Sequence, residues 1–341
     1  MERRSVLVTC GGKWVGMVLA LKQALSEVPA LAGGRLLVAD RDELTPAGCF
    51  ADARFQVPGI NDPDYIDALV ELCAREGVCA LVPLIDIDMR RLAPAADRFA
   101  AVGTHLVSPT VDLVDLCLDK ERFHHFCVDA GLSVPRAFSG DDLDEASFPL
   151  FFRRRNGFGS IGSGRADTLE EARAALQDAE LVFHEFVDAG EVSVDAYINR
   201  DGNCTVRVAR VRDKVLGGEA QRSHTIDDPA TLSLADATID ALAAQGLRGP
   251  LNVQMFLSDP RQLIEVNTRL GSCTVLSNAA TGGRLLRSLL SECAGGTAEG
   301  DRDDYQRDLW IYRYTGDVFH AGPQPVRFSP ARSEHPVEFV E

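Results

Sequence analysis

The sequence lacks the features that mark secreted and membrane-spanning proteins. No apolar run reaches the roughly 18 residues that a membrane helix needs. The N-terminal stretch MERRSVLVTCGG has neither the apolar core nor the cleavage site of a secretory signal. The nine cysteines include no Cys-x-x-Cys pair. We therefore expect a cytoplasmic protein whose cysteines are reduced and mostly act as small buried hydrophobic residues.

An excess of positive charge is also lacking. The chain has 51 Asp and Glu residues against 35 Lys and Arg residues, a net charge of −16. Such a chain repels a polyanion overall, so nucleic acid is not an expected partner unless a local basic patch is present. Because no apolar run is long enough for a membrane helix, a membrane is not expected either. No Gly-x-Ser-x-Gly motif is present, which argues against an α/β-hydrolase. His124 and His125 are adjacent on a predicted helix and face different directions, so they do not form a metal-binding pair.

With 341 residues, of which 45% are hydrophobic, the chain is long enough for two or three compact units. Residues 1–110 alternate between strand-like and helical patterns. The predicted strands are 5–9, 35–40, 79–83 and 104–108, and the predicted helices are 15–25, 65–76 and 91–99. This alternation indicates parallel strands with helical crossovers, and therefore a doubly wound, Rossmann-like α/β unit.

The pattern changes after residue 110 to a mixed α+β order. Helical stretches are expected at 110–131, 168–178, 232–245 and 283–291, and strands at 135–189 around a glycine-rich loop, 190–220, 251–257 and 263–266. Glycines at 295, 296 and 300 indicate a linker. The apolar patch at 310–314 packs either on the core or on a second copy of the chain, so a homodimer is an open alternative.

The most informative stretch is residues 263–271, LIEVNTRLG, which follows a predicted strand containing Gln254. Glu265 and Asn267 are two positions apart on one strand, so they point to the same face, and a hairpin partner brings Gln254 there. Oxygen ligands of this kind suit Mg²⁺, which proteins usually hold by one or two carboxylates together with nucleotide phosphates. Arg269 beside them suits a transferred phosphate. The sequence therefore predicts an enzyme that uses ATP.

Two further segments support a nucleotide site. Residues 153–164, RRRNGFGSIGSG, combine arginines with glycines whose backbone N–H groups can wrap an anion, but no Gly-Lys-Ser/Thr follows, so this is not a Walker A loop. A basic surface loop is the alternative. In residues 182–195, a strand edge and turn can offer backbone groups to adenine, and Glu191 can bind ribose hydroxyls. Acidic turn residues are more often simply solvated.

The N-terminal unit offers weaker candidates. The glycine spacing in residues 10–16, CGGKWVG, is wrong for a dinucleotide fingerprint, although Asp40 ends the next strand as a ribose-binding acid would. A nicotinamide-dependent oxidoreductase is therefore an alternative function. Asp86 and Asp88 follow the strand ending near Pro83, where ligands often bind in α/β folds. Ordinary solvated acids are nevertheless more common in that position.

Taken together, these segments resemble the ATP-grasp superfamily, especially ligases similar to one half of the carbamoyl-phosphate synthase large subunit and the related amino-acid ligases. The resemblance covers about residues 5–295. Asp119-Lys120 resembles the pair that opens the ATP-grasp unit, and residues 184–187, HEFV, resemble the adenine hinge. Residues 252–254 and 264–269 resemble the two metal-binding strands. These motifs occur in the order found in the family.

The resemblance implies a pre-ATP-grasp domain at 1–110, an ATP-grasp domain at 111–298 with a lid at about 134–188, and a C-terminal extension at 299–341. It implies an ADP-forming ligase that joins a small carboxylate, such as an amino acid, to an amine through an acyl phosphate, with ATP and Mg²⁺ (Mn²⁺ as an alternative ion). A nucleotide-binding protein without turnover is a third hypothesis.

The resemblance also assigns roles to individual residues. Nucleotide contacts are expected from Lys120, Arg153, Gly157, Gly159, Ser160, Ile161, Gly162, Glu185, Phe186, Val187 and Glu191. Metal ligands are expected from Gln254, Glu265 and Asn267, and catalytic roles from Arg269, Arg210 and Arg212. Substrate contacts are expected from Asp86, Glu219, Gly271 and Ser272.

Four positions depart from the family pattern. Arg153 stands in place of a lysine, which keeps the charge but changes the donor geometry. Arg154 replaces a usual proline, and Thr268 replaces the proline of an Asn-Pro-Arg triplet. His184 replaces a common glutamine. None of these changes removes a predicted metal ligand.

Overall fold

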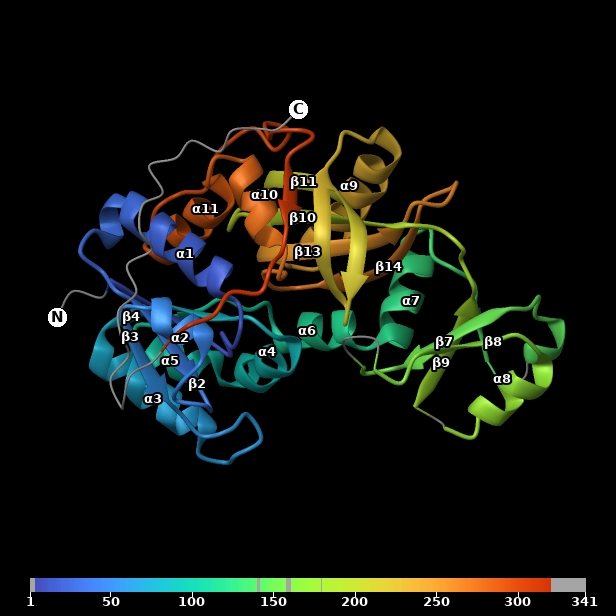
Figure 1. The fold of residues 1–341 in the computed structure, drawn as a ribbon, viewed down its shortest axis with the longest axis horizontal. Coiled ribbons are helices and arrows are strands. Elements are labelled where there is room, and N and C mark those ends of the chain that lie inside the picture. Colours follow the sequence, from blue (N-terminus) through green and yellow to red (C-terminus); the bar gives the residue numbers. More distant parts are fainter. Residues whose placement is uncertain (1–3, 140–141, 158–160, 179, 320–341) are drawn as a thin grey trace.

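The computed structural model describes residues 4–139, 142–157, 161–178 and 180–319. In this part of the chain the strands form three sheets. Figure 1 shows the N-terminal unit at one end of the long axis, a central sheet in the middle and a smaller sheet at the other end. The described chain thus consists of three units, each formed around its own sheet.

The N-terminal unit is a parallel sheet in the order β3-β2-β1-β4-β5. Its strands are β1 (Ser5–Thr9), β2 (Leu36–Asp40), β3 (Ala53–Gln56), β4 (Val78–Pro83) and β5 (His105–Leu106). Its helices are α1 (Val15–Glu27), α2 (Pro46–Phe50), α3 (Tyr65–Glu76), α4 (Asp86–Leu92) and α5 (Ala96–Ala101), with short 3₁₀ turns at Pro29–Leu31 and Ala93–Ala95. The predicted doubly wound fold is confirmed, with the central strands fully buried.

Two local expectations for this unit were wrong. The helix expected at 91–99 is split into α4 and α5 by a 3₁₀ turn containing Pro94, because proline has no N–H to continue the helix. The edge strand β3 was not predicted. Its sequence, Ala-Arg-Phe-Gln, alternates apolar and polar residues, but over only four positions, the shortest run that indicates a half-buried strand.

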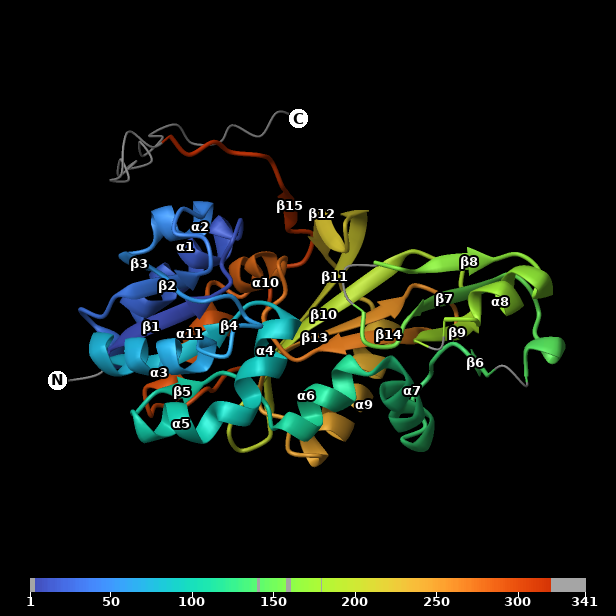
Figure 2. The same cartoon turned by 90° about the horizontal axis from the view of Figure 1, so that it is seen from below.

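The second unit is built on an antiparallel sheet in the order β14-β13-β10-β11-β12-β15. Its strands are β10 (Glu191–Ile198), β11 (Cys204–Leu216), β12 (Glu219–Thr225), β13 (Gly249–Phe256), β14 (Gln262–Asn267) and β15 (Trp310–Tyr312). Helices α6 (Val111–Leu118), α7 (Lys120–Asp129) and α9 (Pro229–Ala244) cover one face, and α10 (Thr274–Ala280) and α11 (Arg284–Cys293) cover the other (Figure 2).

One expected helix, at 110–131, is also two helices. Asp119 ends α6 and caps α7, since its carboxylate accepts hydrogen bonds of 3.1 Å from the backbone N–H groups of Glu121 and Arg122. The break turns Lys120, the first residue of α7, toward the glycine-rich loop.

A four-stranded antiparallel sheet, here called the lid sheet, lies at the far end (Figure 1). Its order is β6-β9-β7-β8, from β6 (Ala137–Phe138), β7 (Leu150–Arg154), β8 (Gly164–Ala166) and β9 (Leu181–Glu185). Helix α8 (Leu169–Ala175) and a 3₁₀ turn (Leu143–Glu145) close one face.

The N-terminal unit and the central sheet share one hydrophobic core. Buried side chains of β1, β2 and α1 pack with those of β11 and α11, including Val8, Leu21, Val208 and Leu286. Such a continuous core fixes the two units relative to each other. Side chains from both units can therefore hold a constant geometry relative to each other.

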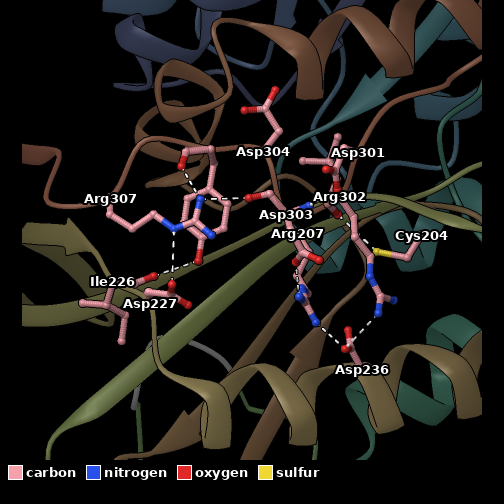
Figure 3. A network of polar contacts seen from close by, with 12 residues as sticks. Cys204, Arg207, Ile226, Asp227, Asp236, Asp301, Arg302, Asp303, Asp304 and Arg307 are labelled. Atoms are coloured by element: carbon pink, nitrogen blue, oxygen red, sulfur yellow. Dashed lines mark hydrogen bonds and ion pairs between the residues drawn. The ribbon is translucent and has the colours of Figure 1, made fainter.

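The predicted C-terminal extension adds the edge strand β15 to the central sheet, with Trp310 opposite His224. Figure 3 shows the polar contacts that hold the preceding segment. Arg207 of β11 forms ion pairs with Asp236 of α9 and with Asp303, and Arg302 also contacts Asp236, at 3.3 Å. These contacts fasten the segment across the sheet edge before β15 begins.

None of the helices in the described ranges combines the length and apolar character that a bilayer crossing requires. All nine cysteines are free thiols, and each is buried or half-buried.

Candidate active site

A cavity of about 640 Å³ lies where the three units meet. Of the described residues predicted for the site, all except Gly162 line it: Asp86, Lys120, Arg153, Gly157, Ile161, Glu185, Phe186, Val187, Glu191, Arg210, Arg212, Glu219, Gln254, Glu265, Asn267, Arg269, Gly271 and Ser272. Gly159 and Ser160 fall outside the described residues. The predicted site residues, spread over nearly 190 positions, are thus brought to one place by the fold.

The proposed metal ligands lie on neighbouring strands. The β13–β14 register places Gln254 opposite Glu265 and Asn252 opposite Asn267. The amide of Asn267 lies 3.4 Å from the Glu265 carboxylate, and all three predicted ligands line the cavity. One carboxylate with two amide side chains is a hard-oxygen set that fits Mg²⁺ when phosphate oxygens complete the coordination.

Two cations lie beside this carboxylate. Arg153 on β7 donates to the backbone carbonyl of Ile264 at 2.9 Å, and its Nη1 lies 3.6 Å from Glu265 Oε2. The Lys120 ammonium donates to the carbonyl of Gly157 at 2.5 Å, which ties α7 to the glycine-rich loop. Burial lowers the pKa of both cations, whereas the Glu265 charge acts in the opposite direction. Partly desolvated cations of this kind attract phosphate strongly.

Within the glycine-rich loop, Gly162 supports the turn and does not line the cavity. Its φ of +74° lies in the left-handed region, and a Cβ there would meet the Arg154 side chain at 3.0 Å. Glycine is therefore required for the path of the loop.

The expected base and ribose contacts lie where β9 ends. Phe186 and Val187 follow β9 along the cavity wall. Glu185 accepts a hydrogen bond of 3.1 Å from Gln262, which joins the lid sheet to the central sheet. The carboxylate of Glu191 is ion-paired to Arg212 Nε at 2.9 Å. A ribose hydroxyl would therefore meet a carboxylate that is already oriented.

The opposite side of the cavity is built from the N-terminal unit. Asp86 and Arg269 form a two-pronged ion pair, with Nε–Oδ1 and Nη2–Oδ2 distances of 2.8 and 2.6 Å. The Arg269 guanidinium also lies 5.9 Å from the ring centre of Trp14. Asp86 is thus half-buried in a specific contact rather than freely solvated, and it holds the arginine predicted to meet the phosphate.

The expectation that Asp88 is a solvated acid was wrong. Its side chain is completely buried and accepts hydrogen bonds from Thr9 at 2.5 Å and Tyr65 at 2.7 Å. Burial raises the pKa of Asp88 above its ordinary value, while these hydrogen bonds act against the increase. Asp40 accepts a hydrogen bond of 3.1 Å from the Gly12 N–H, so it braces the glycine turn after β1.

Arg210 is more deeply buried than expected for a residue predicted to orient a substrate. It is 2% exposed and pairs with Asp195 at 2.8 Å. Asp195 also accepts hydrogen bonds from Asn252, Thr274 and Ser277. Burial would raise the pKa of Asp195, but Arg210 and these hydrogen bonds bring it below its ordinary value. This network holds the floor of the cavity, and a substrate-orienting role for Arg210 remains a prediction.

Arg313, which follows the edge strand β15, was not identified as a site residue from the sequence. Its Nη1 lies 3.2 Å from Glu219, and its Nη2 donates to the carbonyl of Ser272. Lys13 lies 3.3 Å from the other oxygen of Glu219. Arg313 occurs in a segment with little periodicity and no motif, so only the β12–β15 pairing shows that it reaches the site.

Comparisons with known proteins agree with this architecture. Residues 6–107 match a family model described as "PylC-like, N-terminal domain", and residues 117–273 match one described as "ATP-grasp domain". The carbamoyl phosphate synthase large chain of Thermoplasma acidophilum is 26% identical over 276 residues, which are 73% of this chain and 26% of that protein. The chain spans about a quarter or less of the length of the first curated relatives it matches.

Solved structures show the same fold. The biotin carboxylase domain of Hydrogenobacter thermophilus 2-oxoglutarate carboxylase, in complex with MgADP and bicarbonate, has a TM-score of 0.74 at 16% identity, covering 91% of this chain and 74% of that one. The L-amino acid ligase of Bacillus licheniformis has a TM-score of 0.65 at 18% identity, covering 85% and 75%. The expected resemblance is confirmed: the chain contains a PylC-like N-terminal domain at residues 6–107, followed by an ATP-grasp domain at residues 117–273.

Proposed function

We propose that the protein is an ATP- and Mg²⁺-dependent, ADP-forming ligase that joins a small carboxylate to an amine. The observation that carries this proposal is that Gln254, Glu265 and Asn267 meet two cations, the buried Lys120 and the half-buried Arg153, on the wall of one cavity. Relatives and structural neighbours include ligases and carboxylases, one of them in complex with MgADP. An amino acid or related acid is the substrate class that we propose.

Phosphoryl transfer depends mainly on positioning the reactants and neutralising charge, and different residues of the chain would serve these two purposes. Glu265, Asn267 and Gln254 would hold Mg²⁺, which supplies charge neutralisation between the phosphates. Lys120 and Arg153 would bind the phosphates farther from the transferred group. Arg269, oriented by Asp86, would steady the transferred phosphate and the acyl phosphate that forms from the carboxylate.

The amine would then attack the carbonyl carbon of the acyl phosphate, forming the C–N bond and releasing phosphate. The amine must lose a proton in this step, and Glu219 is a carboxylate on the cavity wall near Ser272. The glycine-rich loop at 157–162 would exclude water, because an acyl phosphate is otherwise hydrolysed.

The test is a screen for ADP and phosphate release over pairs of small carboxylates and amines, with Glu265→Gln as the decisive variant. We expect at least about a 100-fold loss of substrate-dependent ADP release, because a metal carboxylate is removed while the side-chain shape is kept. The matched control is Glu121→Gln, an acid on α7 that does not line the cavity. Full activity of Glu265→Gln would refute the metal assignment.

A further inference from the structure

The C-terminal segment brings Arg313 to the wall of the cavity. Arg313 follows β15, and its backbone N–H donates to the carbonyl of Gln221 at 2.9 Å, so the pairing with β12 continues past the end of β15 (Figure 2). The residues that match the ATP-grasp family model end at 273, so Arg313 lies outside them. Its contacts are thus an addition to the part of the chain that the family model covers.

The Glu219 carboxylate lies between two cations that come from opposite ends of the chain. Arg313 Nη1 lies 3.2 Å from Glu219 Oε2, and Lys13 Nζ lies 3.3 Å from Glu219 Oε1. Arg313 also donates through Nη2 to the backbone carbonyl of Ser272. Because Glu219 and Ser272 both line the cavity, Arg313 fixes the orientation of two groups in its wall.

The two cations differ in how firmly they hold this carboxylate. The Arg313 side chain is 22% exposed and has a second partner in the Ser272 carbonyl, whereas the Lys13 side chain is 71% exposed. An exposed ion pair contributes little, because water competes for both charges and a long side chain has to be ordered. A cationic ligand in the cavity can therefore replace Lys13 at Oε1 of Glu219 while Arg313 keeps Oε2 in place.

An aliphatic amine, which is protonated at neutral pH, presents such a cation. We propose that Arg313 is a positioning residue that orients Glu219 so that its Oε1 receives the ammonium group of the amine substrate in place of Lys13. The amine substrate is then a positively charged aliphatic amine, and its charge is what the Glu219–Arg313 pair recognises. This inference rests on the proposed function, in which the amine attacks the acyl phosphate.

The experiment compares charged amines with an uncharged one, using the full chain and Mg-ATP. Hydroxylamine, which is mostly uncharged at neutral pH and converts an acyl phosphate to a hydroxamate, first identifies the carboxylate. The charged amines, methylamine and the common amino acids, are then tested with that carboxylate. Arg313→Gln should raise KM for the charged amine about tenfold, the effect of one hydrogen bond to a charged group, and leave KM for ATP and for the carboxylate unchanged. Hydroxamate formation should change little, because hydroxylamine brings no charge to Glu219.

Two further variants sharpen the test. Lys13→Gln should lower KM for the charged amine about two- to threefold, because it removes the group that competes for Glu219. Arg313→Lys keeps the charge and should recover part of the affinity. The control is Arg222→Gln, the same change at an exposed position of β12 that does not line the cavity, and it should behave like the wild type. If Arg313→Gln does not fold, the opposite shift in Lys13→Gln carries the test.

The outcomes separate this inference from the proposed function. Unchanged kinetics in Arg313→Gln, or an equal loss with both kinds of amine, would overturn the role of Arg313, since an equal loss reports a structural role. A higher KM in Lys13→Gln would also overturn it. A wild type that forms a hydroxamate but accepts no charged amine would overturn the ammonium site and leave the acyl phosphate step standing. A wild type that releases no ADP with any carboxylate would refute the proposed function and this inference with it.

Discussion

The lid sheet and the rest of the molecule differ in the size of the core that holds each of them. Among the described residues, the lid core has six buried side chains: Phe138, Leu143, Leu150, Ala166, Ala172 and Phe183. The N-terminal unit and the central sheet instead share a continuous core that runs from β1 to α11. A unit with a small hydrophobic core unfolds locally at a low free-energy cost. The proposed metal and substrate residues thus lie on the well-packed part, and Arg153 lies on the part that opens more easily.

The largest expected effect comes from a matched pair of core truncations. Leu286→Ala in the shared core should lower the free energy of unfolding by about 2–5 kcal/mol, because it leaves a cavity in a fully buried position. Leu150→Ala, also fully buried but in the lid core, should loosen the lid sheet alone. Thermal unfolding should report the first change, and amide hydrogen exchange in residues 137–185 the second. Equal shifts of one common transition would contradict the comparison.

The next effect concerns the contact that joins the N-terminal unit to the phosphate side of the site. Asp86→Asn should reduce kcat/KM for ADP release about 10- to 100-fold, because the Arg269 guanidinium loses a charged two-pronged partner. Asp67→Asn is the control, since it removes an acid that is 69% exposed and paired to Arg98 on the same unit. If both variants kept wild-type kinetics, Asp86 would not be a positioning residue.

The smallest effect is the pH dependence of the lid sheet. Folding lowers the pKa of His184 from an ordinary value near 6.5 to about 3, so below pH 6.5 the unfolded state binds more protons. As the pH decreases from about 6.5 to 3, the free energy of unfolding of the lid sheet should therefore decrease, by at most about 1.4 kcal/mol per pH unit. His184→Gln should flatten this slope, measured by hydrogen exchange at pH 7 and pH 5. A slope that is identical in the two proteins would show that other groups cause it.

Strand alternation allowed the common face of Gln254, Glu265 and Asn267 to be predicted, because Glu265 and Asn267 lie two apart and a short hairpin determines their partner. The break at Asp119 and the split at Pro94 were missed, since helical periodicity continues through both positions. Long-range contacts were also missed. The burial of Asp88 depends on Thr9 and Tyr65, and no local pattern signals a contact between residues so far apart in sequence. For the same reason, Arg313 was found only through strand pairing.

The ion pair of Asp303 with Arg207 limits how the final strand, β15, can align with β12. It holds the chain to Arg207, and seven residues later Trp310 pairs with His224, so the spacing decides which way each following side chain points. One residue inserted between Asp303 and Trp310 would reverse the alternation of β15 and turn its aromatic rings inward. It would also draw Arg313 away from Glu219 and Ser272. Loop length at the outer edge of the molecule thereby affects which side chains surround Glu219 and Ser272 in the cavity wall.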